Sequence, residues 1–235
     1  MHLLLLSSSK EGQGGYLEHA LPFIQLHLGS IKNILFIPYA GVSLGWDEYT
    51  QRVQQALADF NIQGIHQTTD PITAINQAQA IMVGGGNTFA LLNHLYQKDL
   101  LNVIKQRVNA NIPYIGWSAG SNIAGSSIRT TNDMPIIQPP SFDALKLMPF
   151  QINPHYSDVQ APGHHGETRA QRIQEFTCLN PNMPVIALRE GSALQRNGNQ
   201  LTLLGNRDGL VFLDDKQQTI KPASNLDHYL VEQYD

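Results

Sequence analysis

The sequence predicts an α/β protein with a mostly parallel sheet between layers of helices and antiparallel strands toward the C-terminus. Short, nearly continuous apolar runs alternate with longer amphipathic stretches through the first half, which is typical of βαβ units. Gly, Ser, Asn or Pro bound these runs, as expected of buried strands. The last part of the chain instead carries closely spaced turn signals. Because no linker or internal repeat divides the sequence, we expect a single domain over residues 1–235.

The first half contains four apolar runs that predict buried strands, at residues 2–6, 33–38, 80–83 and 112–117. Two stretches between them carry apolar side chains at the helical period, and predict helices over 47–60 and 87–108. Asp70-Pro71 is a helix-start signal, because Asp caps a helix and Pro fits its first turn. We expect a short helix from there through Ile75, with a strand at 64–67 before it.

The second half changes character. Residues 126–142 are polar and rich in proline, which predicts a long excursion loop. Beyond it, apolar runs predict strands at 145–153 and 184–188, and a helical pattern predicts a helix over 168–178. The remainder, 192–220, predicts an antiparallel meander with turns at 206–209 and 214–216. Its strongest hairpin signal is Asn197-Gly198.

Composition narrows the class of protein. The 235 residues include 15 Lys+Arg and 19 Asp+Glu, which gives a net charge of −4. Such a chain lacks the excess of basic residues expected of a protein that binds nucleic acid or an anionic membrane. The only cysteine, Cys178, cannot form an internal disulfide, which favours a reducing compartment. The N-terminus lacks the basic region and cleavage site of a signal peptide, and no apolar run is long enough to span a membrane. We therefore expect a cytoplasmic, soluble protein, and the sequence leaves open whether it is a monomer or a homodimer.

The most specific motif is Gly116-Trp117-Ser118-Ala119-Gly120, at the end of an apolar strand and before small residues that can start a helix. A G-x-S-x-G in this context predicts a nucleophile elbow, whose tight turn needs glycine two positions before and after the serine. The helix behind it directs N–H groups and a partial positive charge at developing negative charge. Ser118 is the predicted nucleophile. The alternative is a glycine-rich turn with a solvated serine.

A run of three glycines ends at Gly86, directly after the expected strand 80–83. Its spacing matches neither G-x-G-x-x-G nor G-K-[ST], so the sequence supports nucleotide binding only weakly. If the two strands are neighbours in a parallel sheet, Gly86 and Ser118 lie on the same rim. An N–H from this loop, together with that of Ala119, then forms an oxyanion hole. The alternative is a tight strand-to-helix turn without a catalytic role.

A serine nucleophile needs a base and an acid that orients it. Among nine histidines, His155 follows an apolar strand and a proline, so it is expected at a strand end, where a rigid scaffold delivers catalytic groups. Asp133, on the polar loop, and Glu190, after the strand 184–188, are the candidate acids. Sequence alone does not choose between them.

A metal site is the other chemistry that histidines offer. His164 and His165 are adjacent in a glycine-flanked loop, and a three-histidine zinc site is conceivable. There is neither an H-E-x-x-H motif nor a second ligand cluster. We therefore expect no metal and no cofactor.

Four segments together resemble the peptidase E family of α-aspartyl dipeptidases: G-G-G-N-T, I-G-W-S-A-G-S-N, Q-I-N-P-H-Y and G-E-T-R-x-Q-R-I. The likeness extends from the first strand to the final strands. It implies a cytoplasmic serine dipeptidase that removes an N-terminal aspartate from Asp-X dipeptides without a cofactor. It also implies a flavodoxin-like α/β sandwich related to class I glutamine amidotransferases. Those enzymes carry cysteine at the elbow, where this chain has Ser118.

The resemblance also implies roles for single residues. The nucleophile falls on Ser118 and the histidine on His155. The third member has been assigned in the family both to the loop aspartate, here Asp133, and to a glutamate, here Glu190. Both positions are filled, so the choice stays open.

Recognition of an aspartate side chain requires a cation, and arginine suits a carboxylate best because its planar fork donates two parallel hydrogen bonds. The candidates are Arg169, Arg172 and Arg189. We favour Arg169, because the G-E-T-R motif starts a helix that follows the loop from the catalytic histidine. The alternative is a solvated helix-start arginine paired to Glu167.

Two other functions fit the same motifs. A cyanophycinase-like serine hydrolase would share the elbow and act on β-linked aspartyl polymers. A catalytically inactive sensor or binding protein would keep the pocket and lack an activated serine.

Overall fold

The computed structural model describes residues 1–160, 163 and 165–231. Its strands are β1 His2–Leu6, β2 Asn33–Ile37, β3 Asn61–Gly64, β4 Ile81–Val83, β5 Tyr114–Trp117, β6 Gln151–Asn153, β7 Val185–Ala187, β8 Ala193–Asn197, β9 Gln200–Leu204, β10 Gly209–Leu213 and β11 Lys216–Ile220. Its α-helices are α1 Leu21–Leu28, α2 Trp46–Ala56, α3 Pro71–Gln77, α4 Thr88–Gln97, α5 Leu100–Asn109, α6 Ala119–Asn122 and α7 Arg169–Leu179. Short 3-10 turns cover Glu18–Ala20, Ile65–Gln67 and Asp227–Leu230.

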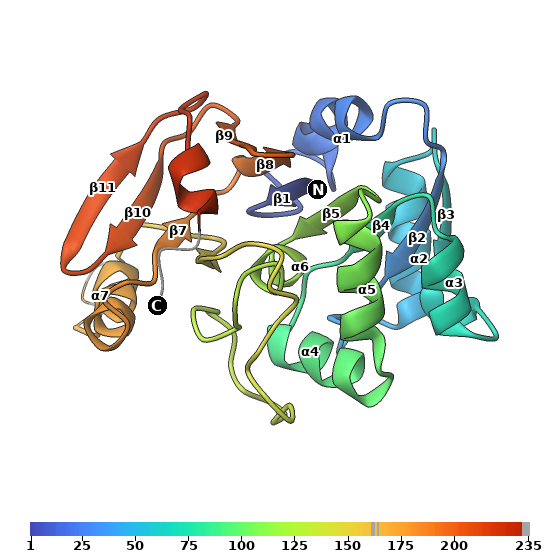
Figure 1. Ribbon diagram of the computed structural model, residues 1–235, viewed down its shortest axis with the longest axis horizontal. Helices are drawn as coiled ribbons and strands as arrows, with labels where there is room; N and C mark the ends of the chain where they lie inside the picture. The colour runs from blue at the N-terminus through green and yellow to red at the C-terminus, as the bar shows by residue number, and fades with distance from the viewer. Residues whose placement is uncertain (161–162, 164, 232–235) are drawn as a thin grey trace.

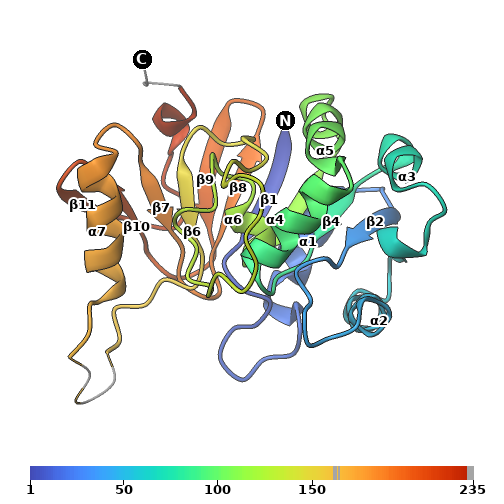
Figure 2. The ribbon, with the colours of Figure 1, turned by 90° about the horizontal axis from the view of Figure 1, so that it is seen from below.

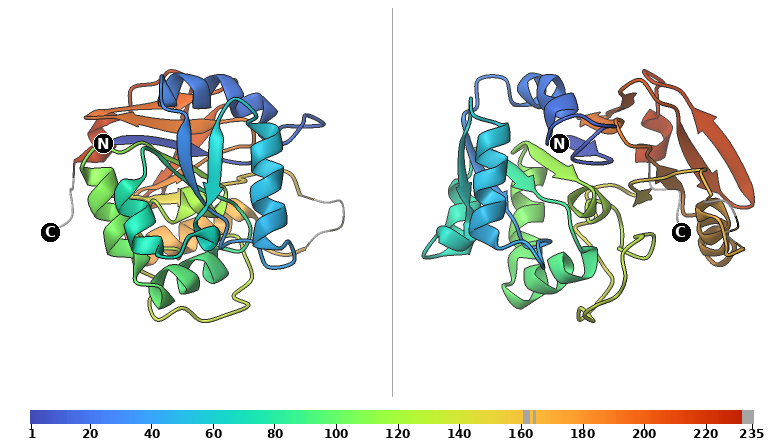
Figure 3. Two further views of the ribbon diagram at one scale, coloured as in Figure 1. Left: turned by 90° about the vertical axis from the view of Figure 1, so that its right-hand side faces the viewer. Right: turned by 180° about the vertical axis from the view of Figure 1, so that it is seen from behind.

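The strands form two sheets. The seven-stranded sheet has the order β3-β2-β4-β5-β1-β8-β9, and the four-stranded sheet has the order β11-β10-β7-β6. The smaller sheet and α7 stand at one end of the molecule, with α2 and α3 at the other (Figure 1 and Figure 3). The predicted α/β class, with a mostly parallel sheet and antiparallel C-terminal strands, is confirmed.

The five parallel strands of the larger sheet end at one rim. β5 pairs with β1 on one side and β4 on the other, so that Leu6 lies opposite Trp117 and Val83 opposite Gly116. β2 continues the sheet beside β4, and β3 lies at its edge. The four strands predicted in the first half are all present. Because β4 and β5 are neighbours, the segments that follow them begin side by side.

Alternate side chains of the central strands face opposite layers of helices. Leu3 and Leu5 of β1 pack in a buried cluster with residues of α3, α4 and α5. Leu4 and Leu6 pack on the other face with residues of α1 and α2. Figure 2 shows β2 between α3 on one side and α2 on the other. The predicted start of α3 is confirmed, because Asp70 Oδ1 accepts hydrogen bonds from two N–H groups of its first turn.

The smaller sheet is covered by α7. Ile173 and Phe176 of this helix pack against β7 and β10. Thr168 and Gln171 start the helix with a reciprocal capping box, at 3.0 and 2.8 Å. The opposite face of β7 contributes Ile186 to the cluster shared with the larger sheet.

The helix predicted over 87–108 is two helices. Asp99 separates α4 from α5 with a left-handed φ of 54°. Both helices bury their apolar side on the same cluster, so the periodic pattern continues across the break. Periodicity reports the buried face and cannot detect a single residue at which the axis turns.

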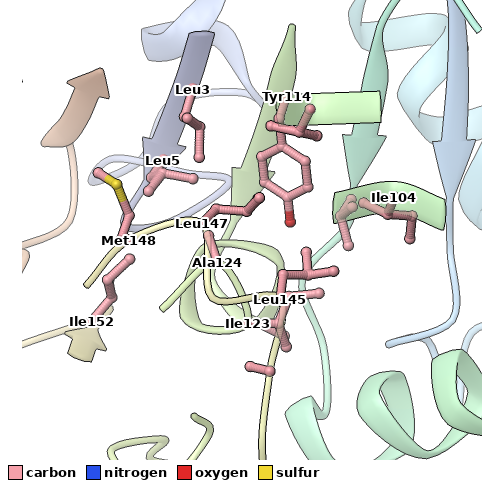
Figure 4. Close-up of a cluster of buried hydrophobic side chains, with 14 of the residues drawn as sticks. Leu3, Leu5, Ile104, Tyr114, Ile123, Ala124, Leu145, Leu147, Met148 and Ile152 are labelled. Atoms are coloured by element: carbon pink, nitrogen blue, oxygen red, sulfur yellow. The ribbon is translucent and has the colours of Figure 1, made fainter. Parts of the chain in front are cut away.

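The strand predicted over 145–153 exists only at Gln151–Asn153. Leu145, Leu147 and Met148 are buried, and Figure 4 shows them with Ile123 and Ala124 in one cluster. Their N–H groups donate to carbonyl oxygens at the end of α6, including Leu145 N to Ile123 O at 2.9 Å and Met148 N to Ala124 O at 3.0 Å. Residues 145–148 are apolar because they are buried. Their N–H groups bond to the end of α6 and not to a neighbouring strand, so they form no strand.

Two other predictions need correction. Residues 64–67 form the end of β3 followed by a 3-10 turn, which the Gln67 side chain closes by accepting from Gly64 N at 3.3 Å. Residues 192–220 form two hairpins in different sheets: β8 pairs with β9, and β10 pairs with β11. In the described part of the chain, every helix is too short or too polar to cross a membrane.

Candidate active site

Ser118 lies at the turn between β5 and α6, with φ 53° and ψ −115°. Such strained backbone costs on the order of 1–3 kcal/mol. The flanking glycines allow the turn, because a Cβ at Gly116 would lie 2.4 Å from Gly120 O, and one at Gly120 would lie 2.1 Å from Val83 O. Ser118 N donates to Leu6 O at 3.2 Å, which anchors the turn to β1. This is the shape that a nucleophile elbow requires.

The glycine loop after β4 lies against this turn. A Cβ at Gly85 would lie 2.8 Å from Ser118 Cβ, and one at Gly86 would lie 2.2 Å from Ala40 O. Both glycines and Ser118 line a cavity of about 460 Å³. Among the described residues, the N–H groups of Gly86 and Ala119 have no hydrogen-bond acceptor. Both donors are therefore available to an oxyanion.

His155 follows β6 and lines the same cavity. It also has a positive φ, 54°, and main-chain hydrogen bonds hold it there. Its N–H donates to Ser7 Oγ at 2.9 Å, and its carbonyl accepts from Arg169 at 3.3 Å. Ser7 Oγ in turn donates to Leu188 O at 2.8 Å. Within the described residues, no hydrogen bond joins the imidazole to Ser118 Oγ.

Glu190 is hydrogen-bonded to the imidazole of His155. His155 Nδ1 lies 2.9 Å from Glu190 Oε1. A carboxylate can only accept, so Nδ1 carries a proton, and in the neutral imidazole Nε2 then has the free lone pair. The two residues meet because β6 and β7 are parallel neighbours, with Asn153 opposite Ala187, and each residue follows the carboxyl end of its strand.

Asp133 binds the start of α4 and, among the described residues, forms no hydrogen bond with His155. Its Oδ2 accepts from Thr88 N at 2.7 Å, from Thr88 Oγ1 at 2.6 Å and from Thr131 Oγ1 at 3.2 Å. It therefore ties the excursion loop to the start of α4, where the helix dipole favours a carboxylate. The structure brings Glu190, and not Asp133, to His155.

Arg169 is the first residue of α7 and is half-buried. Burial lowers the pKa of its guanidinium, and the nearby Arg172 lowers it further. In the described part of the chain, no salt bridge involves Arg169. A partly desolvated cation beside the backbone of His155 suits an anionic ligand.

The other candidate arginines are engaged elsewhere. Arg172 pairs with Glu167 at 3.6 Å, so the partner considered for Arg169 belongs to its neighbour. Arg189 forms a salt bridge with Asp158 and donates to Asp208 O at 2.7 Å. Its side chain has different partners from that of the adjacent Glu190. Both residues lie beyond the end of β7 at Ala187, so the strand alternation expected for them does not account for the difference.

The chain matches the family described as Peptidase family S51, over residues 3–204. The chain belongs to peptidase family S51. It is 56% identical over 233 residues to Peptidase E of Shewanella denitrificans, covering 98% of this chain and 99% of that one. It is 58% identical over 218 residues to Peptidase E of Shewanella amazonensis, covering 92% and 93%. The resemblance to the peptidase E family is confirmed, and the protein is a peptidase.

Solved structures agree on the fold of this S51 peptidase. A structure from Listeria monocytogenes with a peptidase E designation has a TM-score of 0.67 at 23% identity, covering 87% of this chain and 98% of that one. A peptidase from an acI-B1 Actinobacterium has a TM-score of 0.71 at 15% identity, covering 96% of each chain. At these identities the likeness establishes the fold alone.

Sequence reasoning missed several residues around the cavity of this S51 peptidase. Tyr49 and Arg52 of α2 line it, as does Tyr16. The helical pattern over 47–60 accounts for Tyr49 only as one of its apolar residues, and so gives no signal for its hydroxyl. Ser7 directly follows β1, whose carboxyl end lies at the same rim of the sheet as Gly86. The reasoning that places Gly86 beside Ser118 at this rim would therefore also have indicated Ser7.

A larger hollow of about 1040 Å³ lies beside β3 and α3 and contains neither Ser118 nor His155. Its lining is mostly amide, hydroxyl and small apolar side chains, and its carboxylate, Asp70, caps α3. We assign the candidate site to the smaller cavity because Ser118 and His155 both line it.

A metal centre gains no support from the described residues, in which no group of three or more His, Cys, Asp or Glu side chains could hold an ion. His165 is exposed. His164 lies outside the described residues.

Proposed function

We propose that this S51 peptidase is a serine dipeptidase that hydrolyses dipeptides with an N-terminal aspartate. The observation that carries the proposal is that the strained Ser118 and His155 line one cavity, with Glu190 hydrogen-bonded to His155 Nδ1. A cavity of about 460 Å³ is in the range of small-molecule sites, which favours a short substrate. The relatives named Peptidase E support the same reading.

In the first half-reaction, Ser118 Oγ attacks the scissile carbonyl carbon while His155 Nε2 takes its proton. The carbonyl oxygen becomes an oxyanion, stabilised by the N–H groups of Gly86 and Ala119. The carbon–nitrogen bond then breaks, and the imidazolium gives its proton to the leaving amine. Glu190 holds the Nδ1–H tautomer and stabilises the imidazolium.

In the second half-reaction, water attacks the aspartyl ester on Ser118. His155 takes a proton from the water and returns one to Ser118 Oγ as the ester bond breaks. Aspartate leaves. No cofactor takes part in either step.

Selectivity for aspartate is assigned to Arg169. A substrate carboxylate beside this guanidinium would supply the anionic partner that the described residues do not. A carboxylate buried without such a partner would cost several kcal/mol.

Ser118→Ala tests the nucleophile. We expect an intact fold, because the half-buried hydroxyl makes no hydrogen bond among the described residues, and a kcat for Asp-Leu lower by on the order of 10⁶. Circular dichroism and the melting temperature provide the folding control. A purified variant with a tenth of wild-type activity would remove Ser118 from the mechanism.

A substrate panel separates the proposal from its alternatives. We expect Asp-Leu to be cleaved, β-Asp-Arg to be left intact, and a serine-directed phosphonate to label the wild type but not Ser118→Ala. Cleavage of β-Asp-Arg alone would favour the polymer hydrolase, and absence of labelling a binding protein. EDTA should not change the rate; activity lost to EDTA and restored by zinc would favour a metal mechanism.

A further inference from the structure

The hydroxyl of Tyr49 joins three groups beneath the elbow. It lies 2.9 Å from Gly85 O, 3.1 Å from Trp117 Nε1 and 3.3 Å from the hydroxyl of Tyr16. Trp117 directly precedes Ser118, and Gly85 directly precedes the oxyanion donor Gly86. One buried oxygen therefore links the nucleophile turn to the glycine loop.

The direction of each hydrogen bond follows from the groups involved. An indole N–H can only donate and a carbonyl oxygen can only accept. The Tyr49 hydroxyl must therefore accept from Trp117 and donate its own hydrogen to Gly85 O. The Tyr16 hydroxyl in turn donates to the Tyr49 oxygen. Burial raises the pKa of Tyr49, so the hydroxyl stays protonated and remains a donor.

This bond sets the orientation of the Gly85–Gly86 peptide. In a trans peptide the C=O and N–H point in opposite directions. With Gly85 O held by Tyr49, the N–H of Gly86 must point away from the tyrosine. On either side, Gly84 N and Asn87 N donate to main-chain oxygens at 3.1 and 2.9 Å, while Gly86 N has no acceptor among the described residues.

The platform under this peptide is rigid. Phe36 stacks on Trp117 with ring centroids 5.7 Å apart and an interplanar angle of 8°. Its edge-to-face contact with Tyr49 has centroids 5.1 Å apart. All three rings are buried, so the hydroxyl has little freedom to move away from Gly85 O.

We infer that Tyr49 is a positioning residue, which holds the Gly85–Gly86 peptide so that the Gly86 N–H points at the oxyanion. The inference rests on the proposed serine mechanism and extends it. Tyr49 does not touch the reacting atoms. Its contribution should appear mainly in the tetrahedral intermediate and the adjoining transition states, in which the substrate oxygen carries negative charge, because a preorganised donor stabilises those states most.

Tyr49→Phe tests this directly, since it keeps the ring and removes the donor. Loss of one oxyanion donor costs roughly 10²–10³ in kcat, and a donor that is only loosened should cost roughly 10- to 100-fold. We expect that fall in kcat for Asp-Leu, with KM changed less than about threefold. Tyr96→Phe is the matched control, because it removes a tyrosine hydroxyl that also donates to a main-chain carbonyl, Asp143 O at 2.9 Å, outside this cavity; its kcat should stay within about threefold of wild type.

A second readout excludes a general structural effect. The boronic-acid analogue of aspartate forms a tetrahedral adduct with a serine, whereas free aspartate does not. Tyr49→Phe should weaken the boronate by the same roughly 10- to 100-fold and aspartate by less than about threefold. Replacing Tyr49 by 4-aminophenylalanine, which restores a donor, should recover most of the kcat. Equal losses for boronate and aspartate would overturn the inference.

A measurement on the wild-type protein covers the case in which Tyr49→Phe does not fold. With ¹⁵N-glycine labelling, the Gly86 amide proton should shift downfield when the boronate binds, and an unchanged resonance would overturn the inference. Ser118→Ala separates the two levels of the argument. An active Ser118→Ala contradicts the proposed function, whereas an inactive Ser118→Ala beside a fully active Tyr49→Phe contradicts the role of Tyr49 alone.

Discussion

Glu190 and Asp133 bind different partners, and substitution should separate their roles. Glu190→Gln keeps the size of the side chain but favours the wrong tautomer of His155, because an amide can donate to Nδ1. We expect kcat to fall by about 10²–10⁴. Asp133→Asn weakens the anchor on Thr88 and should affect KM or the melting temperature more than kcat. Equal, severe losses of kcat for both would contradict the assignment of Glu190.

Two arginines can test which cation recognises the aspartate side chain. Arg169 lies beside His155, whereas Arg52 lines the cavity and forms a salt bridge with Glu48 of the same helix at 3.8 Å. Arg169→Met should lower kcat/KM for Asp-Leu, with a loss of transition-state stabilisation of roughly 2–5 kcal/mol. The loss should be much smaller for Asn-Leu, if that dipeptide is cleaved. Arg52→Met is the control and should change this preference little. A variant at Arg169 that still prefers Asp over Asn as strongly as wild type would show that another residue binds the carboxylate.

The two sheets meet at the end of β1, and Ser7 is the link. This buried serine donates to Leu188 O beyond β7, accepts from His155 N beyond β6, and bonds through its own N–H to Ser192 O at 2.9 Å. Ser118 N bonds to Leu6 O one residue earlier. Ser118 and His155, the proposed nucleophile and base, therefore follow strands of different sheets, but both are hydrogen-bonded to the end of β1, through Leu6 and Ser7.

Ser7→Ala should disturb both the junction and the chemistry. It leaves the N–H of His155 and the carbonyl of Leu188 without this partner, which costs about 1–3 kcal/mol of unfolding free energy. We expect kcat to fall by about tenfold as His155 shifts. Ser8→Ala is the matched control, because Ser8 is equally buried and donates to Lys10 O at 2.6 Å. Similar losses of kcat for both variants would show that the effect is not specific to the link with His155.

Stability of the whole molecule should depend on pH through His27, a half-buried histidine of α1. Burial lowers the pKa of His27 to about 4, with His2 as a second cause, against an unfolded value of about 6.5. Between these values the unfolded chain binds the proton and the folded chain does not. The stabilising contribution is therefore present above pH 6.5 and is lost as the pH falls toward 4, by roughly 3 kcal/mol at most.

His27→Gln should flatten this dependence. Urea unfolding between pH 4.5 and 7.5, a range chosen to span the two pKa values, gives the slope of the unfolding free energy. His228→Gln is the control, because this side chain is exposed. An unchanged slope in His27→Gln would assign the acid sensitivity to other groups.

Local chemistry explains what could be predicted from the residues alone. Continuous apolar runs identify buried strands, Asp70-Pro71 starts α3, and G-x-S-x-G at a strand end indicates the turn at Ser118. Each of these features depends on neighbours within a few positions, through sterics, capping and side-chain alternation. The common rim of Gly86 and Ser118 followed as well, once their strands were assumed to be adjacent.

The remaining features depend on contacts between distant segments. Leu145 is apolar because it is buried, yet its N–H bonds to Ile123 rather than to a strand. In the sequence, Glu190 and Asp133 are both candidates for the acid that binds His155. Pairing of β6 with β7 brings Glu190 to His155, whereas Asp133 accepts a hydrogen bond from Thr88. A side chain's position along the chain predicts the face it occupies. The groups that satisfy its hydrogen bonds come from segments that only the packing of two sheets brings together.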